Sequence, residues 1–157
     1  MSREHHYRVG LFWAGSAHGA TTTYQSYSRE YAVEIEGKPT LRGSADAAFR
    51  GDPTLHNPED LLVAALSSCH MLSYLSHAAR AGLSVVGYSD SAVGTMILDQ
   101  GGGRFSDVLL LPRVILAPGA DAGLAGRLHE AAHRDCFIAK SVNFPVRHEA
   151  TIVMADG

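Results

Sequence analysis

The stretch NPEDLLVAALSSCH, residues 57–70, constrains this 157-residue chain most, because it predicts a long helix with a sharp start. Asn57 can cap free backbone N–H groups with its side chain, and Pro58 suits the first helical position because its missing N–H would be unpaired there anyway. The two acidic residues that follow complement the positive end of the helix dipole. No proline or glycine interrupts until Gly82, which predicts a helix from residue 58 to about 81, roughly 36 Å long.

The first half of this helix has apolar residues on nearly every side, from residue 61 to 66. This pattern predicts a segment that is buried all round. One of only two cysteines in the chain, Cys69, lies near the middle of the helix. A thiol in this place is either inert filling of the core or a protected reactive group.

The composition predicts one globular domain over residues 1–157, with 46% hydrophobic and 18% charged residues. A net charge of −3 without a basic run argues against nucleic acid or an anionic membrane as a partner. The apolar runs are too short to span a bilayer and the first residues lack the apolar region of a signal peptide, so we expect a cytoplasmic protein. In a reducing cytosol, two cysteines favour a redox, metal or catalytic pair over a structural disulfide.

Around the helix, runs of β-branched and aromatic residues alternate with turn residues and predict short strands. Glu36-Gly37-Lys38 suits a hairpin turn, and Gly101-Gly102-Gly103 suits another. The resulting order βββ-α-ββ-α-β is typical of an α+β fold in which sheet covers the central helix. Besides the long helix, the expected elements are strands 7–13, 21–35, 39–47, 83–98, 105–116 and 144–154 and a helix at 122–134.

The two cysteines, Cys69 and Cys136, lie 67 positions apart, so only the fold can bring them together. The residues leave three interpretations open. Each cysteine can be a small buried hydrophobe, as is common for free cysteine. A metal site is the second, because His70 adjoins Cys69 and because His129 and His133 share a helix face, although no CxxC or HExxH element is present. The third is thiol redox chemistry, in which one cysteine attacks and the other resolves.

The segment NPEDLLVAALSSCHMLSYL, with CFIAKSV some 67 positions later, resembles the osmotically inducible protein C and organic hydroperoxide resistance (OsmC/Ohr) family. The segments SYSREY, GSADAAFRGDP and YSDSAVGTM are similar to one of its less studied branches. The resemblance covers roughly residues 7–153. It implies an α+β fold in which antiparallel sheets wrap around long central helices in an intertwined homodimer. It also implies a thiol peroxidase that acts on organic hydroperoxides without a cofactor and is reset by a dithiol reductant.

The resemblance assigns roles to four residues. Cys69 matches the cysteine that peroxide oxidises to a sulfenic acid, and Cys136 matches the one that condenses with it to a disulfide. Glu59 matches the active-site glutamate ten residues before that cysteine, and Arg29 is the best match for the active-site arginine. The alternative is a dimer of the same fold that senses redox state or binds a small molecule without turnover.

The chemistry of these residue types agrees with those roles. Peroxide attack needs a thiolate, and because an apolar site raises a thiol pKa, a cation such as Arg29 is required nearby. Glu59 would hold the guanidinium as a bidentate partner. Against this, Arg29 can be a solvated strand residue and Glu59 a helix N-terminal charge. Ten residues of straight helix place Glu59 and Cys69 about 15 Å apart along the axis, so we expect a second chain to supply the glutamate.

His70 is expected to be a core histidine bonded to a backbone carbonyl, with proton transfer as the alternative. Other histidines are expected at the surface, namely His5, His6, His18 and His148. Aromatic residues are expected mainly in the core, with some lining an apolar mouth suited to alkyl peroxides. They are Phe12, Trp13, Tyr24, Tyr74, Phe137 and Phe144.

Overall fold

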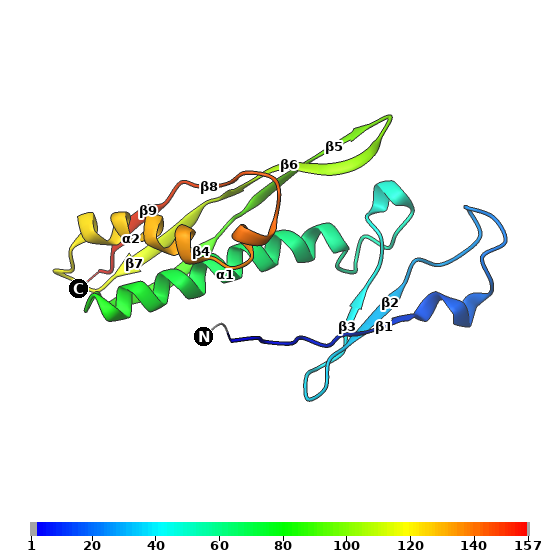
Figure 1. The fold of residues 1–157 in the computed structure, drawn as a ribbon, viewed down its shortest axis with the longest axis horizontal. Helices are drawn as coiled ribbons and strands as arrows, with labels where there is room; N and C mark the ends of the chain where they lie inside the picture. Colours follow the sequence, from blue (N-terminus) through cyan, green and yellow to red (C-terminus); the bar gives the residue numbers. More distant parts are fainter. Residues whose placement is uncertain (1–2, 157) are drawn as a thin grey trace. The chain divides into compact units, whose positions relative to one another are not determined.

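The computed structural model describes residues 3–156 of the chain. The chain divides into two compact units, Met1–Leu61 and Leu62–Gly157. The long helix α1, Pro58–Arg80, begins at the end of the first unit and forms the central element of the second (Figure 1).

The ends of α1 have the predicted chemistry. The Asn57 side-chain oxygen accepts a hydrogen bond from the backbone N–H of Asp60, at 2.7 Å, and so caps the helix. Gly82 adopts φ 69°, a left-handed conformation that glycine tolerates best, and ends the helical run. The predicted helix is therefore confirmed to within one residue at its end.

The burial of α1 differs from the expectation. Ala64 is exposed, so the segment 61–66 is not buried all round in this chain. The buried residues instead form one stripe at every fourth position: Leu66, His70, Tyr74 and Ala78. By length and composition α1 is also apolar enough to cross a membrane, with a mean hydropathy of 1.2, contrary to the expectation from the sequence. One such helix is weak evidence of a membrane span, because the core helix of a soluble protein passes the same test; 22% of the apolar window is buried here.

The first unit is built on a three-stranded antiparallel sheet of order β1-β2-β3. The predicted hairpin turn between β2 and β3 is confirmed, and Lys38 donates its backbone N–H to the carbonyl of Ile35 across it at 3.0 Å. The strand expected at 21–35 begins only at Tyr31, because Ser and Thr side chains bind the backbone before it; Ser26 Oγ accepts from the Thr23 N–H at 3.0 Å. The elements are β1 Gly10–Trp13, η1 Ala14–His18, β2 Tyr31–Glu34, β3 Leu41–Gly43 and η2 Ala47–Phe49.

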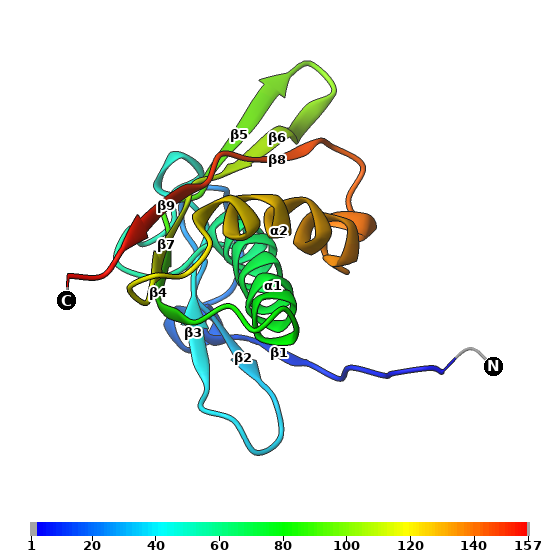
Figure 2. The same cartoon turned by 90° about the vertical axis from the view of Figure 1, so that its left-hand side faces the viewer.

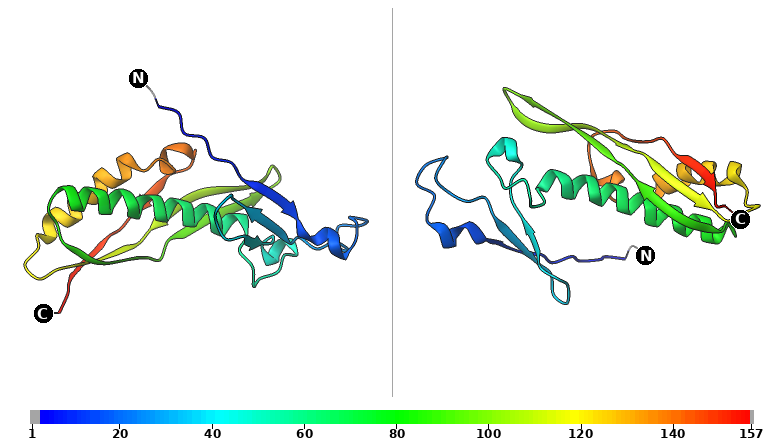
Figure 3. Two further views of the ribbon diagram at one scale, coloured as in Figure 1. Left: turned by 90° about the horizontal axis from the view of Figure 1, so that it is seen from below. Right: turned by 180° about the vertical axis from the view of Figure 1, so that it is seen from behind.

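The second unit contains two three-stranded sheets, β4-β7-β9 and β5-β6-β8. The pairs β4/β7 and β5/β6 are antiparallel, whereas β8 and β9 each add in parallel, so these sheets are mixed and not antiparallel throughout. The expected return strand 105–116 is interrupted at Leu111, whose N–H donates to the Asp90 carboxylate at 2.7 Å. Figure 3 shows the strands of this unit, coloured green through red, lying alongside the green helix α1. The elements are β4 Val85–Asp90, β5 Val93–Asp99, β6 Gly102–Leu110, β7 Pro112–Leu116, α2 Ala122–Asp135, η3 Ala139–Ser141, β8 Val146–His148 and β9 Thr151–Met154.

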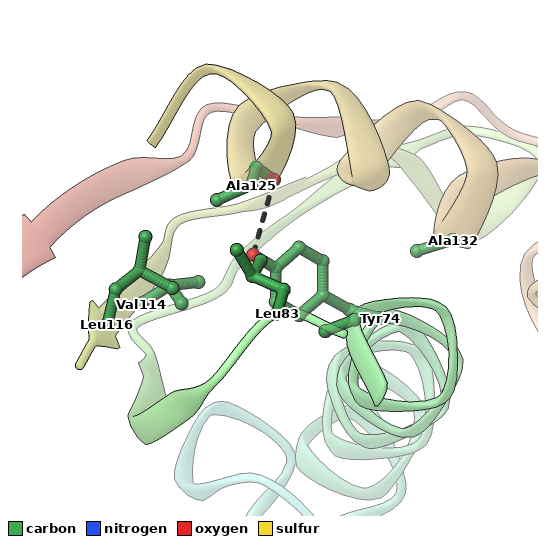
Figure 4. Close-up of a cluster of buried hydrophobic side chains, with 7 residues drawn as sticks. Tyr74, Leu83, Val114, Leu116, Ala125 and Ala132 are labelled. Carbon is green, nitrogen blue, oxygen red and sulfur yellow. Dashed lines mark hydrogen bonds between the residues drawn. The ribbon is translucent and has the colours of Figure 1, made fainter. Parts of the chain in front are cut away.

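The core of the second unit lies where α1, α2 and β7 meet. Tyr74 is fully buried in it and donates its hydroxyl to the carbonyl of Ala125 on α2, at 3.2 Å (Figure 4). A second cluster joins α1 to β6 and β8 through Leu66, Val108, Leu110 and Val146. These layers of helix on sheet confirm the α+β prediction.

The cap at Asn57 gives a first test of how α1 begins. Asn57→Ala is expected to lower the free energy of unfolding by about 1 kcal/mol, because the Asp60 N–H loses its acceptor. Urea titration measures this, and Asn57→Ser, which restores an oxygen at the cap, should recover most of the loss. Equal stability of the alanine and serine variants would contradict the role of the cap.

Candidate active site

The two cysteines meet where α2 ends beside α1. Cys69 lies in the middle of α1, and Cys136 is the C-cap of α2, with its N–H bonded to the carbonyl of His133 at 3.3 Å. Both are free thiols, and they lie close enough together that Cys69 affects the pKa of Cys136. The fold thus brings together two residues that lie 67 positions apart in the sequence.

The two thiols differ in environment. Cys136 is 1% exposed, and its burial raises its pKa well above the ordinary value, an effect to which the neighbouring Cys69 adds. Cys136 therefore keeps its proton near neutral pH. Cys69 is only half-buried. Of the two, Cys69 is the thiol that a solute can reach first.

A separate pocket of about 350 Å³ lies within the first unit. Arg29 and Glu59, the predicted cation and carboxylate, both line it, together with Trp13, Tyr27, Tyr31 and Phe49. The wall is thus largely aromatic, with one basic residue, Arg29, and two acidic ones, Asp46 and Glu59. Trp13 belongs to this wall and not to the core expected for it.

Arg29 is held in place by the loop before β2. Its guanidinium donates to the carbonyl oxygens of Tyr27, at 2.5 Å, and Tyr24, and its Cζ lies 3.8 Å from the centre of the Tyr27 ring. Such a cation stacked on an aromatic face has little freedom to move. Arg29 is accordingly a half-buried loop residue and not a solvated strand residue.

In the described structure, Glu59 does not form the expected bidentate pair with Arg29. Its Oε2 atom is buried and has no hydrogen-bond partner. Burial raises the pKa of the neighbouring Tyr31 hydroxyl, and the charge of Glu59 adds to this effect. The pocket therefore offers a fixed cation and a carboxylate oxygen with free hydrogen-bonding capacity.

The histidines differ from the expectations in two ways. His70 bonds the ring of His129, with 3.0 Å between Nε2 and Nδ1, and not a backbone carbonyl. The side chain of His148 is 15% exposed and packs beside both rings, so it is not a surface group. Within the sequence, the shared helix face of His129 and His133 was the one pattern that indicated this cluster. Within residues 3–156, no three His, Cys, Asp or Glu side chains are placed to hold a metal ion.

The structure thus brings Cys69 and Cys136 together in the second unit and places Arg29 and Glu59 in the lining of one pocket in the first. The fold and the first of these pairs define an α+β protein with a two-cysteine thiol centre. The family model described as OsmC-like protein matches residues 51–151, and the chain belongs to this family. Comparison with curated proteins gave no match.

Solved structures match almost the whole chain. An OsmC-like protein of unknown function from Vibrio cholerae is 32% identical, with a TM-score of 0.84 over 94% of this chain and 99% of that one. An organic hydroperoxide resistance protein OsmC from Legionella pneumophila is 14% identical, with a TM-score of 0.66 over 99% and 100%. One from Elizabethkingia anophelis is 18% identical, with a TM-score of 0.67 over 98% and 100%. At these identities, the similarity to the last two proteins is a similarity of fold.

Proposed function

We propose that the protein is a thiol-dependent peroxidase that reduces organic hydroperoxides. The observation that carries this proposal is the pair of free thiols, one half-buried and one fully buried, that the fold brings close together. Family membership and the likeness to proteins named for organic hydroperoxide resistance support it. The protein would act as a cytoplasmic homodimer without a cofactor.

The proposed cycle begins at Cys69. Its thiolate attacks the terminal oxygen of the hydroperoxide, the O–O bond breaks, and the alkoxide leaves with a proton as the alcohol, so that Cys69 becomes a sulfenic acid. The Cys136 sulfur then attacks the Cys69 sulfur, the sulfenic oxygen leaves as water, and a disulfide forms. An external dithiol reduces this disulfide and is itself oxidised to a disulfide.

Arg29 and Glu59 would serve the first step. A guanidinium favours the Cys69 thiolate and donates hydrogen bonds to a peroxide oxygen, while a carboxylate oxygen orients it. Because Glu59 and Cys69 are ten residues apart on one continuous helix, about 15 Å along its axis, we assign these two roles to a second copy of the chain. The aromatic wall around Arg29 suits the alkyl part of an organic peroxide.

Turnover with a dithiol reductant tests the proposal. With dithiothreitol present, the protein should consume cumene hydroperoxide repeatedly and faster than hydrogen peroxide. Cys69→Ser should remove the activity, and Cys136→Ser should lower it strongly because the sulfenic acid is no longer resolved. Reversible oxidation of the thiols without repeated turnover would favour a redox sensor instead, and unreactive thiols would exclude both.

A further inference from the structure

The buried contacts between α1 and α2 contain an unusual polar pair, His70 and His129. Both side chains are essentially unexposed, at 0% and 1%, and their rings lie parallel within 8°. The bond between His70 Nε2 and His129 Nδ1 is 3.0 Å long. One ring must donate and the other accept, so the accepting ring is neutral when the bond forms.

This pair is not the arrangement that stability alone would favour. His70 Nδ1 and His129 Nε2 are buried without a hydrogen-bond partner, whichever ring donates. Two apolar side chains of similar size would fill the same space without leaving polar atoms unpaired. The pair therefore calls for a role other than filling the core.

The position of the pair indicates that role. His70 directly follows Cys69 on α1, and His129 lies two helical turns before Cys136 on α2. Figure 2, which views α1 nearly end-on, shows α2 lying across it. A buried hydrogen bond between two packed helices restrains how one lies on the other, and this bond is made by the residue next to Cys69.

Two other polar contacts join the same helices among residues 3–156: one reaches α2 farther from Cys136, and the other is exposed. The bond from Tyr74 reaches α2 at Ala125, farther from Cys136 than His129 is. The ion pair of His77 with Asp135, at 2.9 Å, includes a carboxylate that is 58% exposed. An exposed ion pair holds its partners weakly.

We propose that His70 and His129 are positioning residues whose ring-to-ring hydrogen bond sets the crossing of α1 and α2 and so holds Cys136 within reach of Cys69. This inference rests on the disulfide step of the proposed function. Neither histidine touches the reacting atoms in this account. Their effect falls on the closure of the disulfide and not on the first oxidation of Cys69.

The closure step can be measured without a peroxide. When the aromatic disulfide DTNB reacts with Cys69, it releases one thionitrobenzoate and leaves a mixed disulfide on Cys69. The Cys136 thiolate, its proton released to solvent, then attacks the Cys69 sulfur; the protein disulfide forms and a second thionitrobenzoate leaves. The first release depends on reagent concentration and the second does not, so stopped-flow absorbance separates them. Cys136→Ser should lack the second release.

His70→Leu is expected to slow the second release by about tenfold or more and to leave the first within about twofold. His70→Gln should close at nearly the wild-type rate, because its amide nitrogen reaches the place of Nε2. His70→Asn is the matched control: it has the same amide on a side chain one methylene shorter, and it should be slow. Val108→Ala on β6, which is buried away from α2, controls for a general loss of stability.

Closure by His70→Leu at the wild-type rate would overturn the proposal, as would equal rates in the glutamine and asparagine variants. If His70→Leu does not fold, the comparison of glutamine with asparagine decides alone. A protein that closes this disulfide but ignores cumene hydroperoxide would refute the proposed peroxidase and leave the role of the histidine pair standing. Slow closure in Val108→Ala equal to that in His70→Leu would also count against it.

Discussion

Two inactive variants, Cys69→Ser and Arg29→Met, are expected to restore peroxidase activity to each other when their chains are mixed in one dimer. Alone, Cys69→Ser has no sulfur to oxidise. Arg29→Met should lose about a hundredfold or more in rate, because it removes the cation that stabilises the thiolate and the leaving oxygen. If Arg29 acts across the dimer, a mixed dimer joins the intact Cys69 of one chain to the intact Arg29 of the other. Each purified mixed dimer then contains one complete site of two, so it should show about half of the wild-type activity.

The measurement uses two differently tagged chains that are co-expressed and purified through both tags. Recovery of activity also shows that the Arg29→Met chain is folded, since its own Cys69 does the chemistry. Arg42→Met is the matched control and should keep full activity, because Arg42 is an exposed residue that pairs only with Glu30, at 3.1 Å. Mixed dimers no more active than either parent would show that Arg29 does not act on the partner's Cys69.

Acid is expected to destabilise this protein between pH 6.5 and 4, before most carboxylates are protonated. Burial lowers the pKa of His70 to about 4, with His148 and His133 adding to the effect, and burial lowers the pKa of His129 to about 3, with His70 and His148 adding to it. Only two carboxylates oppose it: Asp90, which raises the pKa of His70, and Glu130, which raises that of His148. The folded state therefore binds fewer protons than the unfolded chain between pH 6.5 and 4.

Because the unfolded state binds more protons in this range, the free energy of unfolding falls as the pH falls. Each of the two histidines contributes a slope of about 1.4 kcal/mol per pH unit. Together they should remove on the order of 5 kcal/mol by pH 4, before most carboxylates are protonated. Urea titrations at half-unit steps measure this slope. The double variant His70→Gln/His129→Asn cannot titrate at these positions and should lose most of it; an unchanged slope would refute the assignment.

Local chemistry made the long helix predictable. The cap at Asn57, the proline after it and the glycine with φ 69° at residue 82 act on their immediate neighbours, so the sequence alone places both ends of α1. The loop before β2 could not be placed in this way. Its serine and threonine side chains bind the nearby backbone and displace the strand that the pattern of residues favours.

Contacts between segments that are distant in the sequence could not be predicted from local patterns of residues. The parallel addition of β8 and β9 depends on how the chain returns after α2, which no local pattern specifies. The bond between His70 and His129 joins residues 59 positions apart, and the burial of His148 depends on the same packing. The pairing of Cys69 with Cys136 was expected only through the resemblance to a family, because the residues themselves left three interpretations open.

The intact mass of the protein after one equivalent of cumene hydroperoxide tests the central claim most directly. The wild-type chain should lose about 2 Da as the Cys69–Cys136 disulfide forms, and the same treatment of Cys136→Ser should add about 16 Da, one oxygen on Cys69. Digestion without reductant should then yield one cross-linked peptide containing both cysteines. An unchanged mass in both proteins, or oxygen added to Cys136 in place of Cys69, would contradict the assignment of Cys69 as the residue that peroxide oxidises.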